Sequence, residues 1–247
     1  MHRSYVAKEW IDSFLVDPKT PLPKDAEQRF FLVVRIAKNE TVAVFDGFGR
    51  EIRGVLDKSA NHAVFRAATM IEAQPVKTEI VLIQAAIAYT KMEETIRRGV
   101  EYGVDRFIIV AAKNSERYCF DKLVTKKERL TRIACDACRQ AGRYFLPTIS
   151  FSKHIDHMIK ENENSVGLGV FGDTTSNTLL SHVLKGANVV EDGFYIVVGP
   201  EGGFQQTELD ALRRAAFIGV KWAPFVLRTE LAAIGAIAIF HAFSGRA

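Results

Sequence analysis

Two short segments near the C-terminus combine residues that could bind a ligand and act on it. Residues 199–203, Gly-Pro-Glu-Gly-Gly, hold three glycines in five positions, so the backbone can adopt a positive φ and approach a ligand closely. Residues 227–230, Leu-Arg-Thr-Glu, place two charges between an apolar stretch and an apolar helical stretch. Charged groups in such surroundings need partners. Arg228 and Glu230 therefore either pair with each other or orient a ligand.

The glycine-rich segment differs from the common nucleotide-binding loops. No Gly-Lys-Ser/Thr follows it, and no G-x-G-x-x-G follows the first strand expected in this part of the chain. Nucleotide hydrolysis and ordinary dinucleotide binding are therefore disfavoured. Taken alone, the segment is equally compatible with a tight turn between a strand and a helix.

Two further pairs of residues have a spacing that could suit a metal ion. Cys135 and Cys138 form a lone C-x-x-C, and no second pair completes a zinc site. His154 and His157 have the same spacing in a polar stretch. We interpret the cysteines as packing thiols and the histidines as a solvated helix face, and we expect no metal.

The first 72 residues are rich in short β-type segments. Asp46-Gly47 separates two such segments and predicts a hairpin. Residues 31–35 could form a strand or a helix. The expected strands cover residues 41–45, 50–56 and 63–67. Short strands with glycine turns predict a small barrel or sandwich.

Beyond residue 73, strand-type and helix-type segments alternate, which predicts an α/β domain over residues 73–247 with a largely parallel sheet. The expected strands are residues 79–86, 106–111, 166–171, 194–198 and 222–227. The expected helices are residues 91–102, 121–143, 174–185, 207–216 and 231–243. Thr207 and Asp210 resemble a capping box, and the last helix is apolar nearly all round, so we expect it to be deeply buried. Because ligands bind at the carboxyl ends of such strands, both segments described first should lie at one edge.

The net charge of +4 is small, but the basic excess is concentrated in the middle of the chain. A basic face indicates a polyanion such as nucleic acid, whereas intrahelical ion pairs would make it an ordinary solvated surface. The basic residues of this middle part are Lys113, Arg117, Lys122, Lys126, Lys127, Arg129, Arg132, Arg139 and Arg143.

No apolar run is long enough to span a membrane, and the N-terminus does not resemble a signal peptide, so we expect a cytoplasmic protein.

The two C-terminal segments resemble those of the SPOUT methyltransferases, most closely the ribosomal RNA small subunit methyltransferase E family. The family's GPEGGF and LRTETA patterns correspond to residues 199–204 and 227–232, with Glu208 on the helix between them. Its ELGV, SER, EQSGR, Met-x-Arg and VLR patterns correspond to residues 101–104, 115–117, 139–143, 1–3 and 33–35. The resemblance covers essentially the whole chain. The chain departs from the family at Tyr102, Arg139, Leu231 and at Ala88, where the family commonly has a lysine that Lys91 here stands near.

The resemblance implies a PUA-like β-barrel in residues 1–72, followed by a SPOUT α/β domain in residues 73–247 that ends in a trefoil knot. It implies a homodimer that transfers a methyl group from S-adenosylmethionine (SAM) to N3 of a uridine in 16S rRNA of the small ribosomal subunit. The product of the cofactor would be S-adenosylhomocysteine, and no metal is needed. The alternatives are 2′-O-ribose methylation of RNA by a SPOUT enzyme and a non-catalytic role in RNA binding or ribosome assembly.

The resemblance also assigns roles to particular residues. Glu201 and Glu230 are candidates to accept the N3 proton, and Arg228 to stabilise negative charge on the uracil. Glu201 is equally compatible with a structural role in which it caps the helix that follows. The expected cofactor-binding residues are Phe171, Gly172, Val198, Gly199, Pro200, Glu201, Gly202, Gly203, Val226, Leu227, Thr229, Leu231 and Ala232. The expected RNA-binding residues are Arg3, Arg35, Arg98, Arg117 and Arg143.

Overall fold

A computed structural model describes residues 1–59, 62–163, 167–186 and 193–244 of the protein. The chain divides into two compact units. The N-terminal unit consists of Met1–Pro75 and Cys135–Leu146, and the C-terminal unit of Val76–Ala134 and Pro147–Ala247. Residues 135–146 lie within the range expected for the second domain, yet they pack with the first.

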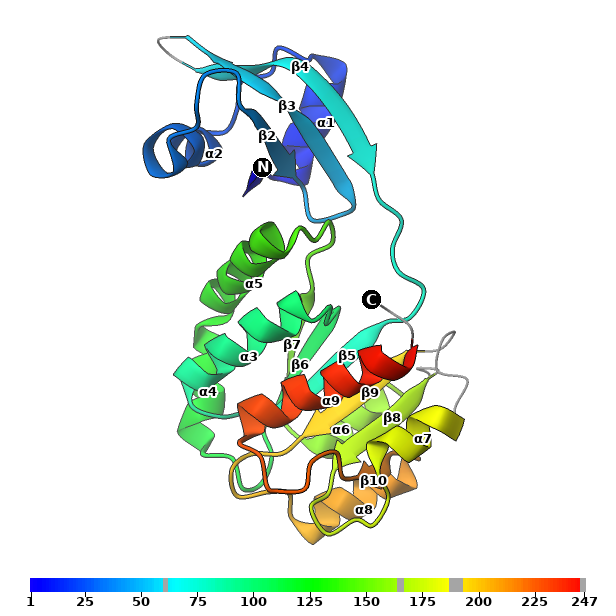
Figure 1. The fold of residues 1–247 in the computed structure, drawn as a ribbon. Coiled ribbons are helices and arrows are strands. Elements are labelled where there is room, and N and C mark those ends of the chain that lie inside the picture. The colour runs from blue at the N-terminus through cyan, green and yellow to red at the C-terminus, as the bar shows by residue number, and fades with distance from the viewer. Residues whose placement is uncertain (60–61, 164–166, 187–192, 245–247) are drawn as a thin grey trace. The chain divides into compact units, whose positions relative to one another are not determined.

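The N-terminal unit is built on a four-stranded sheet of order β1-β2-β3-β4 (Figure 1). The predicted hairpin at Asp46-Gly47 is confirmed: β2 and β3 are antiparallel, and Gly47 has a φ of 77°. Residues 31–35 are helical as far as Val34, and Arg35 ends that turn in the left-handed conformation. The elements are β1 His2–Tyr5, α1 Lys8–Val16, α2 Lys24–Gln28, the π-helical turn η1 Arg29–Val34, β2 Thr41–Phe45, β3 Arg50–Lys58 and β4 Ala63–Glu72.

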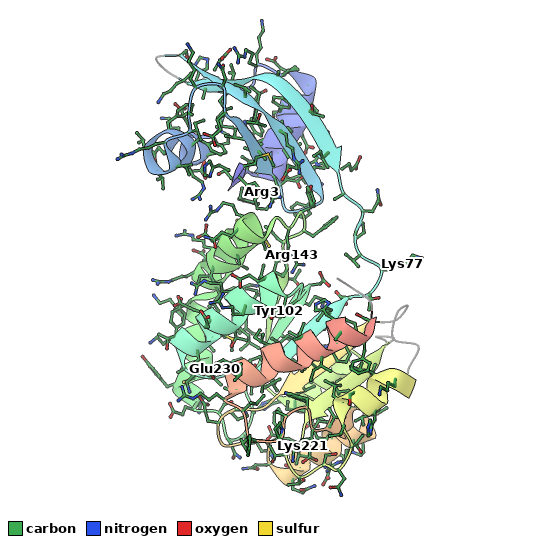
Figure 2. The ribbon with its side chains drawn as sticks, viewed as in Figure 1. Arg3, Lys77, Tyr102, Arg143, Lys221 and Glu230 are labelled. Carbon is green, nitrogen blue, oxygen red and sulfur yellow. The ribbon has the colours of Figure 1, made fainter. Side chains whose placement is uncertain are left out.

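Arg3 is buried in this unit, contrary to the prediction that it contacts RNA. Its Nε donates to Glu51 Oε2 at 2.6 Å, and its other nitrogens donate to the carbonyl oxygens of Cys138 and Arg143. Arg3 is 8% exposed and Glu51 is fully buried. Figure 2 labels Arg3, which lies in β1. Glu51 also accepts a hydrogen bond from Arg53 at 2.5 Å. The guanidinium of Arg3 therefore neutralises an internal carboxylate and is not available to a polyanion.

The C-terminal unit contains a six-stranded, fully parallel sheet of order β10-β8-β9-β5-β6-β7. This confirms the predicted α/β class. The strands are β5 Ile80–Ala85, β6 Arg106–Val110, β7 Thr148–Ser152, β8 Leu168–Gly172, β9 Phe194–Val198 and β10 Ile218–Val220. The helices are α3 Tyr89–Glu101, α4 Arg117–Thr125, α5 Lys127–Ala141, which continues into the N-terminal unit, α6 Ile155–Glu161, α7 Leu180–Gly186, α8 Gln206–Arg214 and α9 Thr229–Ser244.

Side chains along the central strands point alternately to the two faces of the sheet, and helices cover each face, so the core has two layers. Val81 and Ile83 of β5 pack with Met158 of α6 and Leu212 of α8. On the other face, Phe194 of β9 stacks on Phe240 of α9 with ring centroids 4.3 Å apart. Helices α3, α7 and α9 lie together there (Figure 1).

Several expected elements differ from those observed. The helix expected over residues 121–143 is two helices, α4 and α5, separated at Lys126, and β7 was not predicted. The last strand of the sheet, β10, ends at Val220, and residues 222–227 form an irregular loop instead of the expected strand. Helix α7 starts later than predicted. Val166 of the expected third strand lies outside the described residues.

Two other expectations concern helix ends and burial. Helix α8 is capped at Gln205, whose N–H donates to Glu208 Oε2 at 2.9 Å, and not at Thr207. Helix α9 buries only one side, since Leu231 and Phe243 are 54% and 41% exposed. Within the described residues, no helix combines the length and apolar character that crossing a membrane requires.

Candidate functional site

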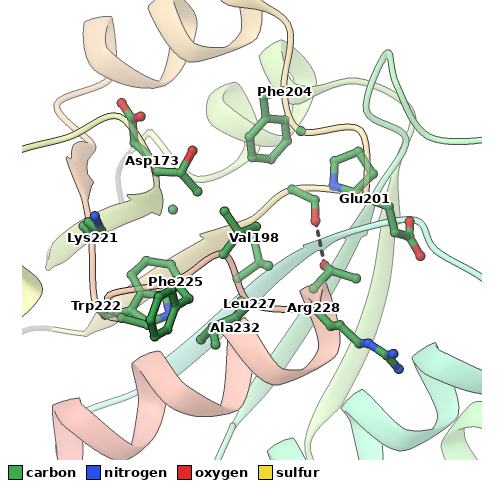
Figure 3. Close-up of a pocket in the computed structure, with 18 of the residues that line it drawn as sticks. Asp173, Val198, Glu201, Phe204, Lys221, Trp222, Phe225, Leu227, Arg228 and Ala232 are labelled. Carbon is green, nitrogen blue, oxygen red and sulfur yellow. Dashed lines mark hydrogen bonds between the residues drawn. The ribbon is translucent and has the colours of Figure 1, made fainter.

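A cavity of about 870 Å³ opens at the carboxyl ends of β8, β9 and β10 (Figure 3). Its walls come from the loops that follow these strands and from the first turn of α9. The sheet brings the loops together because adjacent parallel strands end at the same edge. The lining residues are Lys91, Gly172, Asp173, Thr174, Val198, Gly199, Pro200, Glu201, Gly202, Gly203, Phe204, Val220, Lys221, Trp222, Ala223, Pro224, Phe225, Val226, Leu227, Arg228, Thr229 and Ala232.

A buried hydrogen-bond chain fixes the two main loops to each other. Thr229 Oγ1 donates to the carbonyl oxygen of Gly199 at 2.6 Å and accepts from Gln84 Nε2 at 2.9 Å. Gln84 lies in β5 and is 1% exposed. The start of α9 is thereby held against the end of β9.

The glycine-rich loop is also fixed from its other side. Asn114 Nδ2 donates to the carbonyl oxygens of Gly202 and Gly203, each at 3.1 Å. Gly203 has a φ of +68°, and a Cβ built there would meet no atom within 4 Å. A side chain at this position would therefore enter open space, but in a conformation that costs L-residues free energy.

Aromatic rings line the cavity next to glycines. A Cβ on Gly172 would lie 2.8 Å from the Trp222 ring, and one on Gly199 would lie 3.3 Å from Phe204.

The carboxylate of Asp173 accepts a hydrogen bond from the Thr175 hydroxyl and pairs with Arg213 at 3.0 Å. Burial acts to raise the pKa of Asp173, but these hydrogen bonds and the Arg213 charge hold it below its ordinary value. Asp173 therefore stays ionised at neutral pH.

Four charged residues gather at the Glu201 side of the cavity. Lys91 Nζ lies 2.8 Å from Glu201 Oε1. Burial acts to raise the pKa of Glu201, but the hydrogen bond from Lys91, a backbone hydrogen bond and the lysine charge lower it. The hydrogen bond to Glu201 and the charges of Glu201 and Glu230 raise the pKa of Lys91, against the effect of Arg228. Both members of the pair are charged at neutral pH.

Arg228 and Glu230 do not pair with each other in the described part of the chain. Arg228 is exposed, lines the cavity and forms no ion pair with any described residue. Glu230 Oε2 is buried and has no hydrogen-bond partner among the described residues. One guanidinium and one carboxylate oxygen are thus uncommitted near the cavity.

Most residues expected to bind the cofactor line this cavity, and two do not. Phe171 is fully buried behind it, and Leu231 points outward. Sequence reasoning missed Asp173, Phe204 and Trp222 as lining residues. The pattern of Trp222 and its neighbours predicts a strand, and it does not indicate that they line a cavity. The position of Asp173, directly after a strand, was the one usable signal.

The arginines expected to bind RNA have different surroundings. Arg98 is exposed but pairs with Glu94 at 2.8 Å and Glu101 at 2.9 Å within α3. Arg117 and Arg35 are exposed. Arg143 is half-buried in the N-terminal unit. Intrahelical ion pairs therefore account for part of the basic surface.

The cysteine and histidine pairs behave as packing and surface residues. Cys138 is buried, and burial raises the pKa of the Cys135 thiol to about 12. His157 is largely exposed on α6 beside Glu161. No group of three or more potential metal ligands occurs within the residues that the structure describes.

Comparisons with known proteins agree on the class of this chain. Residues 74–241 match the model of the RNA methyltransferase domain family. Ribosomal RNA small subunit methyltransferase E of Aquifex aeolicus is 27% identical over 224 residues, which is 89% of this chain and 93% of that protein.

Two solved structures extend the similarity to the fold. A Legionella pneumophila protein described as a methyltransferase with bound SAM has a TM-score of 0.80 at 25% identity, covering 97% of this chain and 96% of that one. Ribosomal RNA small subunit methyltransferase E of Neisseria gonorrhoeae, bound to SAM, has a TM-score of 0.77 at 22% identity, covering 98% and 97%, and shows the fold alone. Since the family model covers more than half of the residues, the chain belongs to the RNA methyltransferase domain family.

Proposed function

We propose that the protein is a SAM-dependent methyltransferase that acts on N3 of a specific uridine in 16S rRNA of the small ribosomal subunit. One observation carries the proposal: the two segments singled out in the sequence line a single cavity in a chain of the RNA methyltransferase domain family. The names of the relatives supply the substrate class, and two structurally similar proteins hold SAM.

The residues around the cavity fit SAM. About 870 Å³ falls within the usual range of roughly 300–1,000 Å³ for small-molecule sites. Val198, Leu227 and Ala232 offer an apolar wall for the adenine, and the open space at Gly203 lets the backbone approach the ligand. The ionised Asp173 offers a partner for a cationic amino group.

In this proposal SAM supplies an electrophilic methyl group on a sulfonium, and the protein positions the uridine for in-line attack. As N3 loses its proton, Arg228 stabilises the negative charge that develops on a uracil oxygen. Glu230 has the uncommitted carboxylate oxygen that could accept the proton, whereas the low pKa of Glu201 makes it a poor base. Glu201 instead holds Lys91 beside the reacting groups.

We also propose the finer features that the family resemblance implies, namely a PUA-like N-terminal barrel, a trefoil knot and a homodimer. Exposed apolar side chains beside the cavity support the dimer, since Phe225, Val226 and Leu231 are 82%, 79% and 54% exposed. Arg35, Arg98, Arg117 and Arg143 remain the proposed RNA contacts, and Arg3 is withdrawn because it is buried.

The decisive experiment is nucleoside mass spectrometry of 16S rRNA from a strain that lacks the gene. We expect 3-methyluridine to disappear and to return when the wild-type gene is restored. Persistence of 3-methyluridine would refute the N3 assignment, and loss of a 2′-O-methylated nucleoside in its place would identify a ribose methyltransferase. Calorimetry with SAM separates the non-catalytic alternative, which requires that no SAM binds up to low-millimolar concentrations.

A further inference from the structure

A cluster of aromatic and basic side chains lies on α3, α4 and α5 of the C-terminal unit. It consists of Tyr89, Tyr118, Lys122 and Arg129, and we call it the tyrosine–lysine cluster. Lys122 Nζ lies 5.6 Å from the ring centroids of both Tyr89 and Tyr118. Arg129 Cζ lies 5.9 Å from the Tyr89 ring. Helices α3 and α4 pack against each other, and Arg129 extends the cluster to the first turn of α5 (Figure 1).

The outer part of the cluster is open to solvent. Tyr118 is 70% exposed, although its neighbour Phe120 is buried on the opposite side of α4. Lys122 is exposed and forms no ion pair with any residue that the structure describes. Arg129, in contrast, pairs with Glu93 at 3.2 Å. The cluster therefore presents a largely exposed aromatic ring and an ammonium group that contacts two rings but forms no ion pair within the described residues.

The cluster lies close to the cavity. Lys91, two residues after Tyr89, is a lining residue, and Asn114 of the loop before α4 binds the glycine-rich loop. An RNA segment that enters the cavity from this side would pass the cluster.

An internal structural role explains only part of this arrangement. The contact of Lys122 with Tyr89 would tie α4 to α3, and such cation–π contacts contribute modestly at exposed sites. That role requires neither the exposure of the Tyr118 ring nor an ammonium group without an ion-pair partner. Proteins that bind single-stranded nucleic acid combine these two features, because a base stacks on the ring and a cation attracts the phosphate.

We propose that Tyr118 and Lys122 bind one unpaired ribonucleotide of the RNA substrate beside the nucleotide to be methylated. The base stacks on the open face of Tyr118, and the Lys122 ammonium group contacts the adjoining phosphate. Tyr89 supports Lys122 from the α3 side. This inference rests on the proposed function, since it identifies how the same site holds its substrate.

The test compares Tyr118→Ala with Tyr118→Phe, which keeps the ring. Tyr102→Ala is the matched control, because Tyr102 is a 41%-exposed tyrosine at the other end of α3. Methyl transfer is measured on small ribosomal subunits from the deletion strain, and SAM affinity by calorimetry. Tyr118→Ala should raise the KM for subunits by about tenfold or more and leave SAM affinity unchanged, as expected for loss of one stacked base. Tyr118→Phe and Tyr102→Ala should behave like the wild type.

Binding of a fluorescent single-stranded oligouridine provides a readout that does not need methyl transfer. Tyr118→Ala and Lys122→Gln should both weaken this binding, and Lys122→Gln should also reduce its salt dependence. Unchanged KM and unchanged oligouridine binding in Tyr118→Ala would overturn the inference. A wild-type protein that binds oligouridine through Tyr118 but transfers no methyl group would overturn the proposed function alone. If Tyr118→Ala weakened the binding of polyglutamate and of oligouridine equally, the cluster would be an anion-binding patch that is not specific for RNA, and the inference would be wrong.

Discussion

Thr229 Oγ1 donates a 2.6 Å hydrogen bond to the carbonyl oxygen of Gly199, and this bond joins the start of α9 to the loop after β9. Gln84 Nε2 donates to the same hydroxyl from β5, so three segments share one buried group. A hydroxyl is suited to this position because it can donate and accept at once. The Thr229 side chain therefore links the two loops that border the cavity.

Thr229→Val should weaken SAM binding by about tenfold and lower the free energy of unfolding by about 1–3 kcal/mol, because it removes the hydroxyl. The Gly199 carbonyl loses this donor, and Gln84 Nε2 keeps only its longer contacts with the carbonyl oxygens of Ala85 and Val198, at 3.3 and 3.4 Å. Calorimetry with SAM and urea unfolding measure the two effects. Thr229→Ser keeps the hydroxyl and should retain most of the affinity. Equal affinity of the valine variant and the wild type would show that the bond does not shape the site.

Gly203→Asn and Gly203→Val should both abolish measurable SAM binding. Any side chain at this position enters the open space beside the loop, which is the space that we expect the cofactor to occupy. They should differ in stability. Asparagine tolerates a positive φ, whereas valine would be strained by about 1–2 kcal/mol or more. Calorimetry and thermal unfolding separate obstruction from strain. Wild-type affinity in Gly203→Asn would mean that the loop does not approach the cofactor.

The sequence predicted the site better than it predicted the elements around it. The patterns at residues 199–204 and 227–232 identified two loops, and those loops do line one cavity. The intervening loop, residues 222–226, was missed because Trp222, Phe225 and Val226 have the composition of a strand. Their apolar side chains line the cavity, and Phe225 and Val226 are also largely exposed. Local patterns do not distinguish such positions from core packing.

The sheet was predicted more completely than the division of the chain into units. The four strands β5, β6, β8 and β9 follow from compact apolar runs. Nothing local marks residues 135–146 as part of the N-terminal unit, because they join it through contacts with residues far away in the chain, such as the hydrogen bonds from Arg3 to the carbonyl oxygens of Cys138 and Arg143. Contacts between residues so far apart in the chain leave no periodic signal.

The pH dependence of methyl transfer should not originate from Glu201. Its pKa lies below its ordinary value, so the Lys91 pair is complete above about pH 4.5 and is lost only as the pH falls through the lower folded-state value. The raised pKa of Lys91 keeps the pair intact on the alkaline side. Glu201→Gln should therefore lower kcat/KM but keep the shape of the profile between pH 6 and about pH 9. Loss of an acidic limb in this variant would identify Glu201 as the base.

Arg3→Met should destabilise the N-terminal unit without any direct effect on SAM. Removing the guanidinium leaves the Glu51 carboxylate buried with only the half-exposed Arg53 as a partner, which costs about 3–5 kcal/mol. Urea unfolding checks this. Arg132→Met is the control, since Arg132 is exposed and should change stability by less than about 0.5 kcal/mol. Similar effects of the two substitutions would contradict a structural role for Arg3.

Arg228→Ala should lower kcat at least about 100-fold and change SAM affinity less than about threefold, because the guanidinium acts on charge that develops only in the transition state. Arg228→Lys keeps the charge but not the planar group, so it should restore part of kcat. Single-turnover methyl transfer and calorimetry give the two quantities. The neighbouring Lys91→Met variant shows whether any cation at this edge suffices. If Arg228→Ala loses SAM affinity and kcat in equal proportion, Arg228 binds the cofactor and does not stabilise the uracil anion.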